Sequence, residues 1–116
     1  MSDLPPITDV EMQTITEYAQ SYTVVIVRRG ANHDGPDAAS LRTEHTRRMY
    51  ALRAAGQLAV VLAVRDDSPV EGIAIFDCVP ETVASVMADD PAVIAGVLDY
   101  DIHQAQGFPN DSLRPR

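Results

Sequence analysis

The sequence predicts an α+β domain of the ferredoxin-like type, in which two helices cover one face of a four-stranded antiparallel sheet. Two observations predict this fold. First, apolar residues after position 20 follow strand and helix periodicities in the order β-α-β-β-α-β, for which such a sheet is the standard arrangement. Second, a chain of 116 residues accommodates one domain with a modest core, and not two.

Four segments have the composition of strands. The first two are apolar at both alternating sets of positions, which is typical of strands covered on both faces. The turn-forming sequence Asp66-Asp67-Ser68-Pro69 separates the second from the third, so these two are expected to pair as a hairpin. The last segment alternates between apolar and polar residues. The predicted strands are 22–29, 58–65, 70–78 and 97–104.

Three segments have helical features. Thr8 and Glu11 at the start of the first match a capping box, in which each side chain binds the backbone N–H of the other residue. In the second, Glu44 and Arg48 have the favourable i,i+4 order, and Gly56 fits the position just beyond the helix end. The predicted helices are 9–20, 38–55 and 80–88, followed by a short turn over 92–96.

The chain divides into three parts. We expect an N-terminal extension with a short helix over 1–20, the ferredoxin-like domain over 21–106 and a loose C-terminal tail over 107–116. If both helices of the domain lie on one face of the sheet, the other face needs a cover, because the first two strands are apolar on both sides. A second subunit is the simplest cover for so short a chain, so a homodimer is expected.

The charge balance excludes several classes of partner. The net charge is −8 and no lysine is present, whereas sequence-independent binding to DNA or RNA and docking on anionic membranes both need a basic surface. The longest apolar run, 58–64, is too short to span a bilayer, and the acidic N-terminus does not resemble a signal peptide. The single cysteine, Cys78, can form no internal disulfide and belongs to no Cys/His cluster of the zinc-binding kind. We therefore expect a cytoplasmic protein.

Four features occur in a fixed order between residues 22 and 103. They are the strand that ends at Gly30, His45 with Leu52 and Gly56 after it, the hairpin with its following helix, and Asp90-Pro91 before the last strand. Together they resemble the YCII-related domain family, which has the dimeric α/β-barrel form of the ferredoxin-like fold. The chain departs from the family pattern at Val64-Arg65, where Gly-Pro is common, and at Ala92, where Phe is usual.

The resemblance implies a pair of catalytic residues, His45 and Asp90, that act as an acid/base dyad. A carboxylate bonded to one ring nitrogen of a histidine fixes its tautomer and raises the basicity of the other nitrogen. His45 lies on the apolar stripe of its helix, between Leu41 and Met49, so it is expected to face the sheet. Two alternatives stay open: His45 as a core histidine bonded to a backbone carbonyl, and Asp90 as a turn residue before proline.

Other residues allow further interpretations. If the first two strands are neighbours, two or three of Arg28, Arg29 and Arg65 lie near one end of the sheet, where they would suit the carboxylate of a small substrate. The alternative is that these arginines only solvate the strand ends. We expect Tyr50, Tyr100 and Cys78 to be packing residues. A stripe of metal-binding residue types on the last strand is a metal site, a solvated face or the polar rim of a cavity between subunits, and we assign no metal to it. The stripe consists of Asp99, Asp101 and His103.

Three functional hypotheses follow. The sequence contains neither a Gly-rich dinucleotide loop nor a phosphate loop, so no cofactor is expected. The first hypothesis is a cofactor-independent isomerase or lyase, dehydrochlorinase-like, in which His45 and Asp90 transfer a proton on a small organic substrate. The alternative is a non-catalytic module of the same fold that binds a small ligand or serves a larger assembly. The third is an interaction domain that uses the apolar residues of the first helix, Met12, Ile15 and Ala19.

Overall fold

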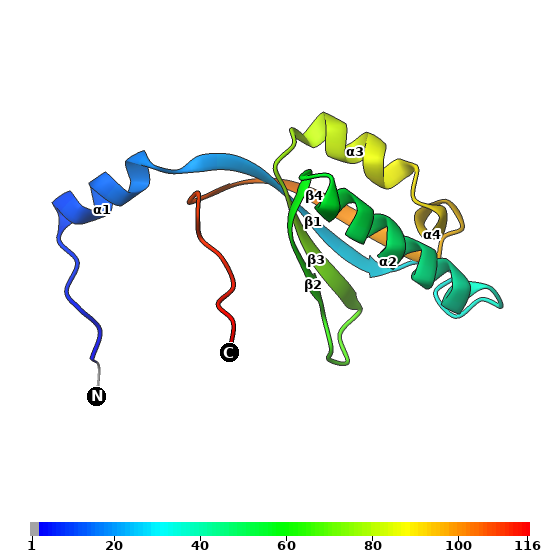
Figure 1. Cartoon of the computed structure of the whole chain (residues 1–116). Coiled ribbons are helices and arrows are strands. Elements are labelled where there is room, and N and C mark those ends of the chain that lie inside the picture. The colour runs from blue at the N-terminus through cyan, green and yellow to red at the C-terminus, as the bar shows by residue number, and fades with distance from the viewer. Residues whose placement is uncertain (1–2) are drawn as a thin grey trace.

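A computed structural model describes residues 3–116, so residues 1 and 2 of the expected N-terminal extension lie outside the described part of the chain. The fold is ferredoxin-like, with a four-stranded antiparallel sheet in the order β2-β3-β1-β4 (Figure 1). The four predicted strands are confirmed, and the second and third form the predicted hairpin. The strands are β1 (Gln20–Arg29), β2 (Leu58–Ala63), β3 (Val70–Phe76) and β4 (Leu98–Gly107).

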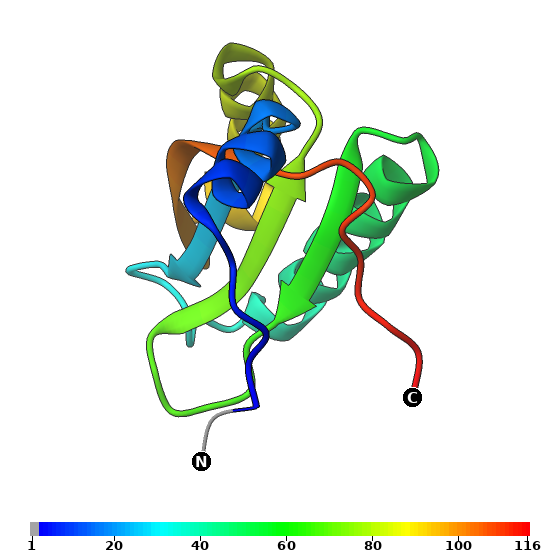
Figure 2. The ribbon, with the colours of Figure 1, turned by 90° about the vertical axis from the view of Figure 1, so that its left-hand side faces the viewer.

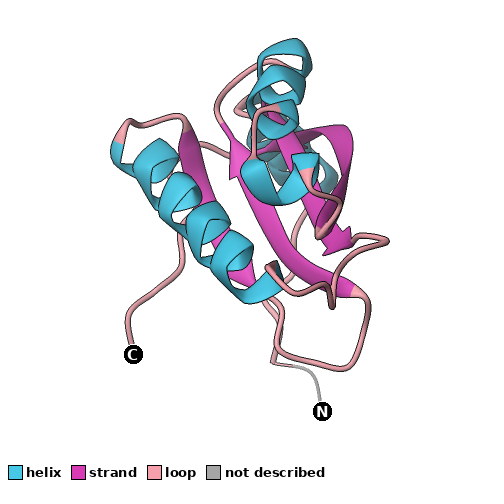
Figure 3. Ribbon diagram, turned by 90° about the vertical axis from the view of Figure 1, so that its right-hand side faces the viewer, coloured by secondary structure: helices cyan, strands magenta, loops and turns pink. Residues whose placement is uncertain are grey.

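The two long helices of the domain lie over the same face of the sheet (Figure 3). The helix that precedes β2 ends as predicted before Gly56, whose φ of 81° lies in the left-handed region that glycine adopts without strain. Pro80 opens the next helix, where a missing N–H costs no helical hydrogen bond. The helices are α1 (Asp9–Glu17), α2 (Ala38–Ala54), α3 (Pro80–Ala88) and α4 (Pro91–Ile94).

Arg48 ties α2 to α3. Its Nη1 group donates a 2.6 Å hydrogen bond to the carbonyl of Val86 in the last turn of α3, where carbonyls lack helical partners. The predicted pairing of Arg48 with Glu44 is wrong, because Glu44 lies 3.5 Å from Arg47 instead. Water screens such exposed ion pairs, so the part-buried carbonyl is the better partner for Arg48.

The core lies between the helices and the sheet. Alternate residues of β1, namely Thr23, Val25 and Val27, point toward the helices and are buried. Tyr100 and Ile102 of β4 pair with Val27 and Val25 and pack on the same core, as the alternation predicted. The other largest buried side chains are those of Met49, Leu58, Phe76, Val83 and Met87.

The opposite face of the sheet is left uncovered by α2 and α3 (Figure 2). In each strand, the residues that alternate with the core residues point to this opposite face. Residues that pair directly across neighbouring strands point to the same face of the sheet. Its apolar residues, all at least partly exposed, are Tyr22, Val24, Ile26, Val60, Leu62, Ile73 and Ile75. A contiguous apolar surface of this kind is typical of a site of interaction.

The strand order separates two arginines that the sequence analysis considered together. β3 lies between β1 and β2, so the first two strands are not neighbours. The condition under which Arg28 and Arg65 would meet at one end of the sheet is therefore not fulfilled. Sequence periodicity identifies strands but does not order them, so it could not decide whether these two strands are neighbours.

A β-bulge interrupts the pairing of β1 with β3. Val27 pairs with Gly72 and Arg28 pairs with Val70, which leaves Glu71 as the extra residue. In a regular strand Glu71 would point away from its neighbour Gly72, toward the uncovered face. The bulge turns the side chain of Glu71 toward α2 instead, where it forms an ion pair.

The N-terminal extension stands out from the body of the domain (Figure 1). The predicted capping box is present: the Glu11 N–H donates to Thr8 Oγ1 at 3.1 Å, and the Thr8 N–H donates to Glu11 Oε1 at 3.3 Å. α1 ends earlier than predicted, because β1 already begins at Gln20, paired with Gly107. No residue of α1 is buried. The radius of gyration of 17.0 Å accordingly exceeds the value of about 13 Å for a compact chain of this length.

Candidate functional site

The side chains of His45 and Asp90 form a hydrogen bond between α2 and α4. Nδ1 of His45 lies 2.7 Å from Oδ2 of Asp90. The side chain of Asp90 is fully buried, and that of His45 is 15% exposed. The bond joins two residues 45 positions apart in the sequence, and its acceptor is a carboxylate rather than a backbone carbonyl.

Asp90 is the N-cap residue of α4. Its backbone is extended, and its Oδ1 accepts a 2.9 Å hydrogen bond from the N–H of Ala92. Pro91 takes the first position of the helix. Asp90 is thus also the turn residue before proline that the sequence analysis considered: one oxygen caps the helix and the other binds the imidazole.

The surroundings of Asp90 keep its carboxyl group ionised. Burial acts to raise the pKa of Asp90, but the hydrogen bond and charge of His45, the N–H of Ala92 and the charge of Arg48, 3.9 Å away, act to lower it and prevail. An ionised carboxylate only accepts hydrogen bonds, so Nδ1 of His45 carries the proton of their shared bond. In a neutral ring Nε2 is then the basic nitrogen.

His45 lines a pocket of about 200 Å³ between α2 and the hairpin of β2 and β3. No buried side-chain nitrogen or oxygen of residues 3–116 lacks a hydrogen-bond partner, and Nε2 of His45 has none, so Nε2 must be accessible to solvent. The apolar part of the pocket wall consists of Val27, Met49, Val61, Leu62, Ala63, Gly72, Ile73, Ala74 and Leu98. A pocket of this size suits a small organic molecule.

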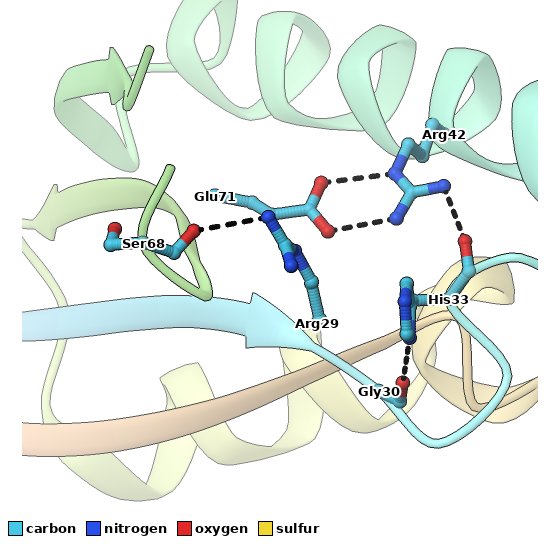
Figure 4. Close-up of polar contacts among 6 residues, drawn as sticks. All are labelled: Arg29, Gly30, His33, Arg42, Ser68 and Glu71. Atoms are coloured by element: carbon cyan, nitrogen blue, oxygen red, sulfur yellow. Dashed lines mark hydrogen bonds and ion pairs between the residues drawn. The ribbon is translucent and has the colours of Figure 1, made fainter. Parts of the chain in front are cut away.

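The pocket also contains an ion pair that the sequence analysis missed. Nε and Nη2 of Arg42 donate to the two carboxylate oxygens of Glu71 at 2.9 and 2.8 Å (Figure 4). Nη1 of Arg42 donates to the carbonyl of His33 at 2.8 Å. The i,i+3 spacing of Arg42 and His45, which places both on one face of α2, was visible in the sequence. The position of Glu71 was not, because it depends on the bulge.

The two arginines expected to bind substrate lie elsewhere. Arg28 points to the uncovered face, where its Nε and Nη2 donate to the carboxylate of Asp101 at 2.9 and 3.0 Å. Arg65 follows β2 in an exposed loop. Neither lines the pocket of His45, whereas Arg42 does.

The polar stripe of β4 lies on the uncovered face, as its alternation predicted, with Asp99 and Asp101 beside Arg28. Among residues 3–116, no three His, Cys, Asp or Glu side chains gather in a way that could hold a metal ion. Tyr50 was expected to pack but is 61% exposed at the pocket. Tyr100 and Cys78 do pack against the core.

Comparisons with known proteins add no family assignment. No protein-family model matches the chain, and no curated protein sequence matches it significantly. The resemblance to the YCII-related domain therefore stays a prediction from the residues that carry it. Within residues 3–116, no helix is both long enough and apolar enough to cross a membrane.

Proposed function

We propose that the protein is a cofactor-independent enzyme of the lyase or isomerase type, in which His45 transfers a proton on a small organic molecule. One observation carries the proposal, namely the 2.7 Å bond between a pocket-lining histidine and a fully buried carboxylate. Burying a carboxylate in its ionised form costs free energy. Such arrangements concentrate at sites that perform acid–base chemistry.

Each partner has a defined part in the proposed reaction. Nε2 of His45 removes a proton from a substrate carbon that is acidified by a neighbouring carbonyl group. Asp90 fixes the orientation of the ring and stabilises the imidazolium that forms. The proton then returns to a different carbon in an isomerisation, or a leaving group departs from the adjacent carbon in an elimination.

The proposal predicts exchange of substrate hydrogen with solvent deuterium. In D₂O, an enzyme that removes and returns a proton at carbon labels its substrate, and mass spectrometry detects the label. We expect the native protein to label at least one compound in a panel of small ketones, 2-oxo acids, enoates and lactones. We expect His45→Gln to slow this labelling by about 10²–10⁴-fold, the usual share of a general base.

Arg47→Gln is the control, since the side chain of Arg47 is 71% exposed on α2 outside the pocket and its replacement should leave the rate unchanged. If the native protein labels no compound and forms no elimination product, or if the native protein and His45→Gln give equal rates, the enzymatic proposal is refuted. The non-catalytic alternative, a pocket that only binds a small ligand, would then be favoured.

We further propose that the uncovered sheet face joins two copies of the chain, as in the dimeric α/β barrel of the YCII-related family. Supporting this, the face carries apolar residues from β1, β2 and β3, and its central residues Val24 and Ile26 are only partly exposed. Such a dimer would cover an apolar surface that water otherwise contacts.

We also propose a cytoplasmic location for the protein, in which the thiol of Cys78 stays reduced.

Ile26→Glu is expected to convert the dimer into a monomer, because it places a carboxylate at the middle of the proposed interface. Light scattering after gel filtration measures the change against the chain mass of 12.6 kDa. Val10→Glu is the control, since Val10 is 73% exposed on α1 and should not affect a dimer formed through the sheet. Dissociation by Val10→Glu alone would instead assign the interface to α1, as the third hypothesis from the sequence holds.

A further inference from the structure

Arg42 and Glu71 form the charged wall of the pocket that contains His45. Arg42 comes one turn before His45 on α2, and Glu71 reaches the same pocket from the bulge of β3. The remaining wall is mainly apolar. A small molecule that fills the pocket therefore meets the imidazole and the guanidinium group together.

The guanidinium group of Arg42 is fixed before any ligand arrives. Glu71 holds its Nε and Nη2, and the carbonyl of His33 holds its Nη1, so α2 is joined to β3 and to the loop after β1 (Figure 4). These bonds use three of the five N–H groups of an arginine, and two remain. Because the side chain is already ordered, binding an anion there costs little additional conformational entropy.

Two guanidinium groups lie near the carboxylate of Glu71, although the whole chain is acidic. The net charge of the chain is −8, yet Arg29 and Arg42 both lie near the single carboxylate of Glu71 (Figure 4). The hydrogen bond from Arg42 lowers the pKa of Glu71 despite burial, and the charges of Arg42, Arg29 and His33 lower it further. Glu71 is thus ionised, and its carboxylate lies near two guanidinium groups, of which that of Arg42 lines the pocket.

We propose that Arg42 is the anion-binding residue of this pocket and that its ligand is a small monocarboxylate. A carboxylate oxygen can accept a remaining N–H group of Arg42 in a charge-assisted hydrogen bond. Glu71 is a positioning residue that acts through Arg42. The inference deepens the proposed function and rests on it for the role of the pocket: Arg42 would hold the carboxylate of the substrate while His45 acts on a nearby carbon.

The test compares charged and uncharged forms of the same small molecules on the full-length protein. The probes are 2-oxobutanoate, 3-methyl-2-oxobutanoate, crotonate and benzoate, each with its methyl ester, and NMR follows the Nε–H signals of arginine and the ring signals of histidine. We expect at least one acid to bind about tenfold more tightly than its ester and to shift the signals of Arg42 and His45.

Arg42→Gln is expected to remove the preference for the acid. Arg47→Gln is the control, because Arg47 lies on the same helix with a side chain that is 71% exposed, and the preference should survive. Since Arg42→Gln leaves Glu71 without its partner, the double variant Arg42→Gln/Glu71→Gln removes both charges together, and it too should lose the preference. Equal affinity of the native protein for acids and esters, or a preference that survives in both Arg42 variants, would overturn the assignment.

His45→Gln separates this inference from the proposed enzymatic function. The variant is expected to lose deuterium labelling but to keep the preference for acids. Acid-selective binding by a native protein that labels nothing would refute the enzyme and retain the anion site. Labelling that does not distinguish acids from esters would retain the enzyme and refute the anion site.

Discussion

Asp90→Ala is expected to lower the free energy of unfolding by about 2–4 kcal/mol. The carboxylate is fully buried, and its removal leaves the Nδ1–H of His45 and the N–H of Ala92 without their acceptor. The loss of the N-cap alone contributes about 1 kcal/mol of this. Urea unfolding measures the effect. Both proteins are compared at the same concentration, because the stability of a protein that associates depends on its concentration.

Asp90→Asn is the matched control for the cap. Asparagine caps helices about as well as aspartate, so its amide oxygen can still accept from Ala92, and only the charge that faces His45 is lost. We expect this variant to lose about half as much stability as Asp90→Ala. Unchanged stability in both variants would show that the buried pair does not hold α4 on the domain.

The pH dependence of stability follows from the lowered pKa of Asp90. The ordinary value is 3.8, and the folded state lies below it, so the stabilising contribution is complete above about pH 4. It is lost as the pH falls through the folded pKa. The advantage of the native protein over Asp90→Asn in free energy of unfolding should therefore shrink on acidification below pH 4. An advantage that does not shrink below pH 4 would contradict this assignment.

Gly30→Ala is expected to lower the free energy of unfolding by more than about 3 kcal/mol or to prevent folding. An added Cβ would lie 2.1 Å from the carbonyl oxygen of Gly96 and 2.7 Å from its carbon. The two backbones cannot separate easily, because the Gly30 N–H donates to Val97 at 2.9 Å and the Asn32 N–H donates to Gly96 at 2.8 Å. This contact joins the end of β1 to the turn between α4 and β4.

Gly56→Ala is the control for the loss of a glycine. Gly56 has a φ of 81°, and no atom lies within 4 Å of an added Cβ, so only backbone strain of about 1–2 kcal/mol is expected. Urea unfolding of both variants gives the comparison. If Gly30→Ala costs no more than Gly56→Ala, the backbones at Gly30 and Gly96 do not pack as closely as described.

The fold could be predicted from the sequence because its signals are local. The capping box, Pro80 and Gly56 mark helix ends, and the alternation in β4 assigns its two faces correctly. The ends of β1 and β4 were missed. There Gln20 and Ser21 pair with Gly107 and Gln106, and polar residues in a two-stranded ladder have no strand periodicity to reveal them.

The candidate site could be predicted only in part. His45 and Asp90 were identified through a resemblance, and their hydrogen bond depends on α4 placing its cap beside α2. The expectation that Arg28 binds substrate together with Arg65 required β1 and β2 to be neighbours. Sequence periodicity does not give the order of strands in a sheet, and β3 lies between these two. Arg42 was overlooked because its partner reaches the pocket only through an irregularity in the sheet.

The bulge at Glu71 depends on the number of residues in the β2–β3 hairpin, so an insertion or deletion there changes the position of the Glu71 side chain. Deleting the residue before Glu71 would restore regular pairing, with Glu71 opposite Arg28, and would turn the carboxylate of Glu71 to the uncovered face, because strand side chains alternate. Arg42 would then lose its partner without any substitution at the pocket. Among relatives of this chain, the length of the β2–β3 hairpin would therefore indicate whether the residue that corresponds to Arg42 has a carboxylate partner. The identity of the pocket residues alone would not.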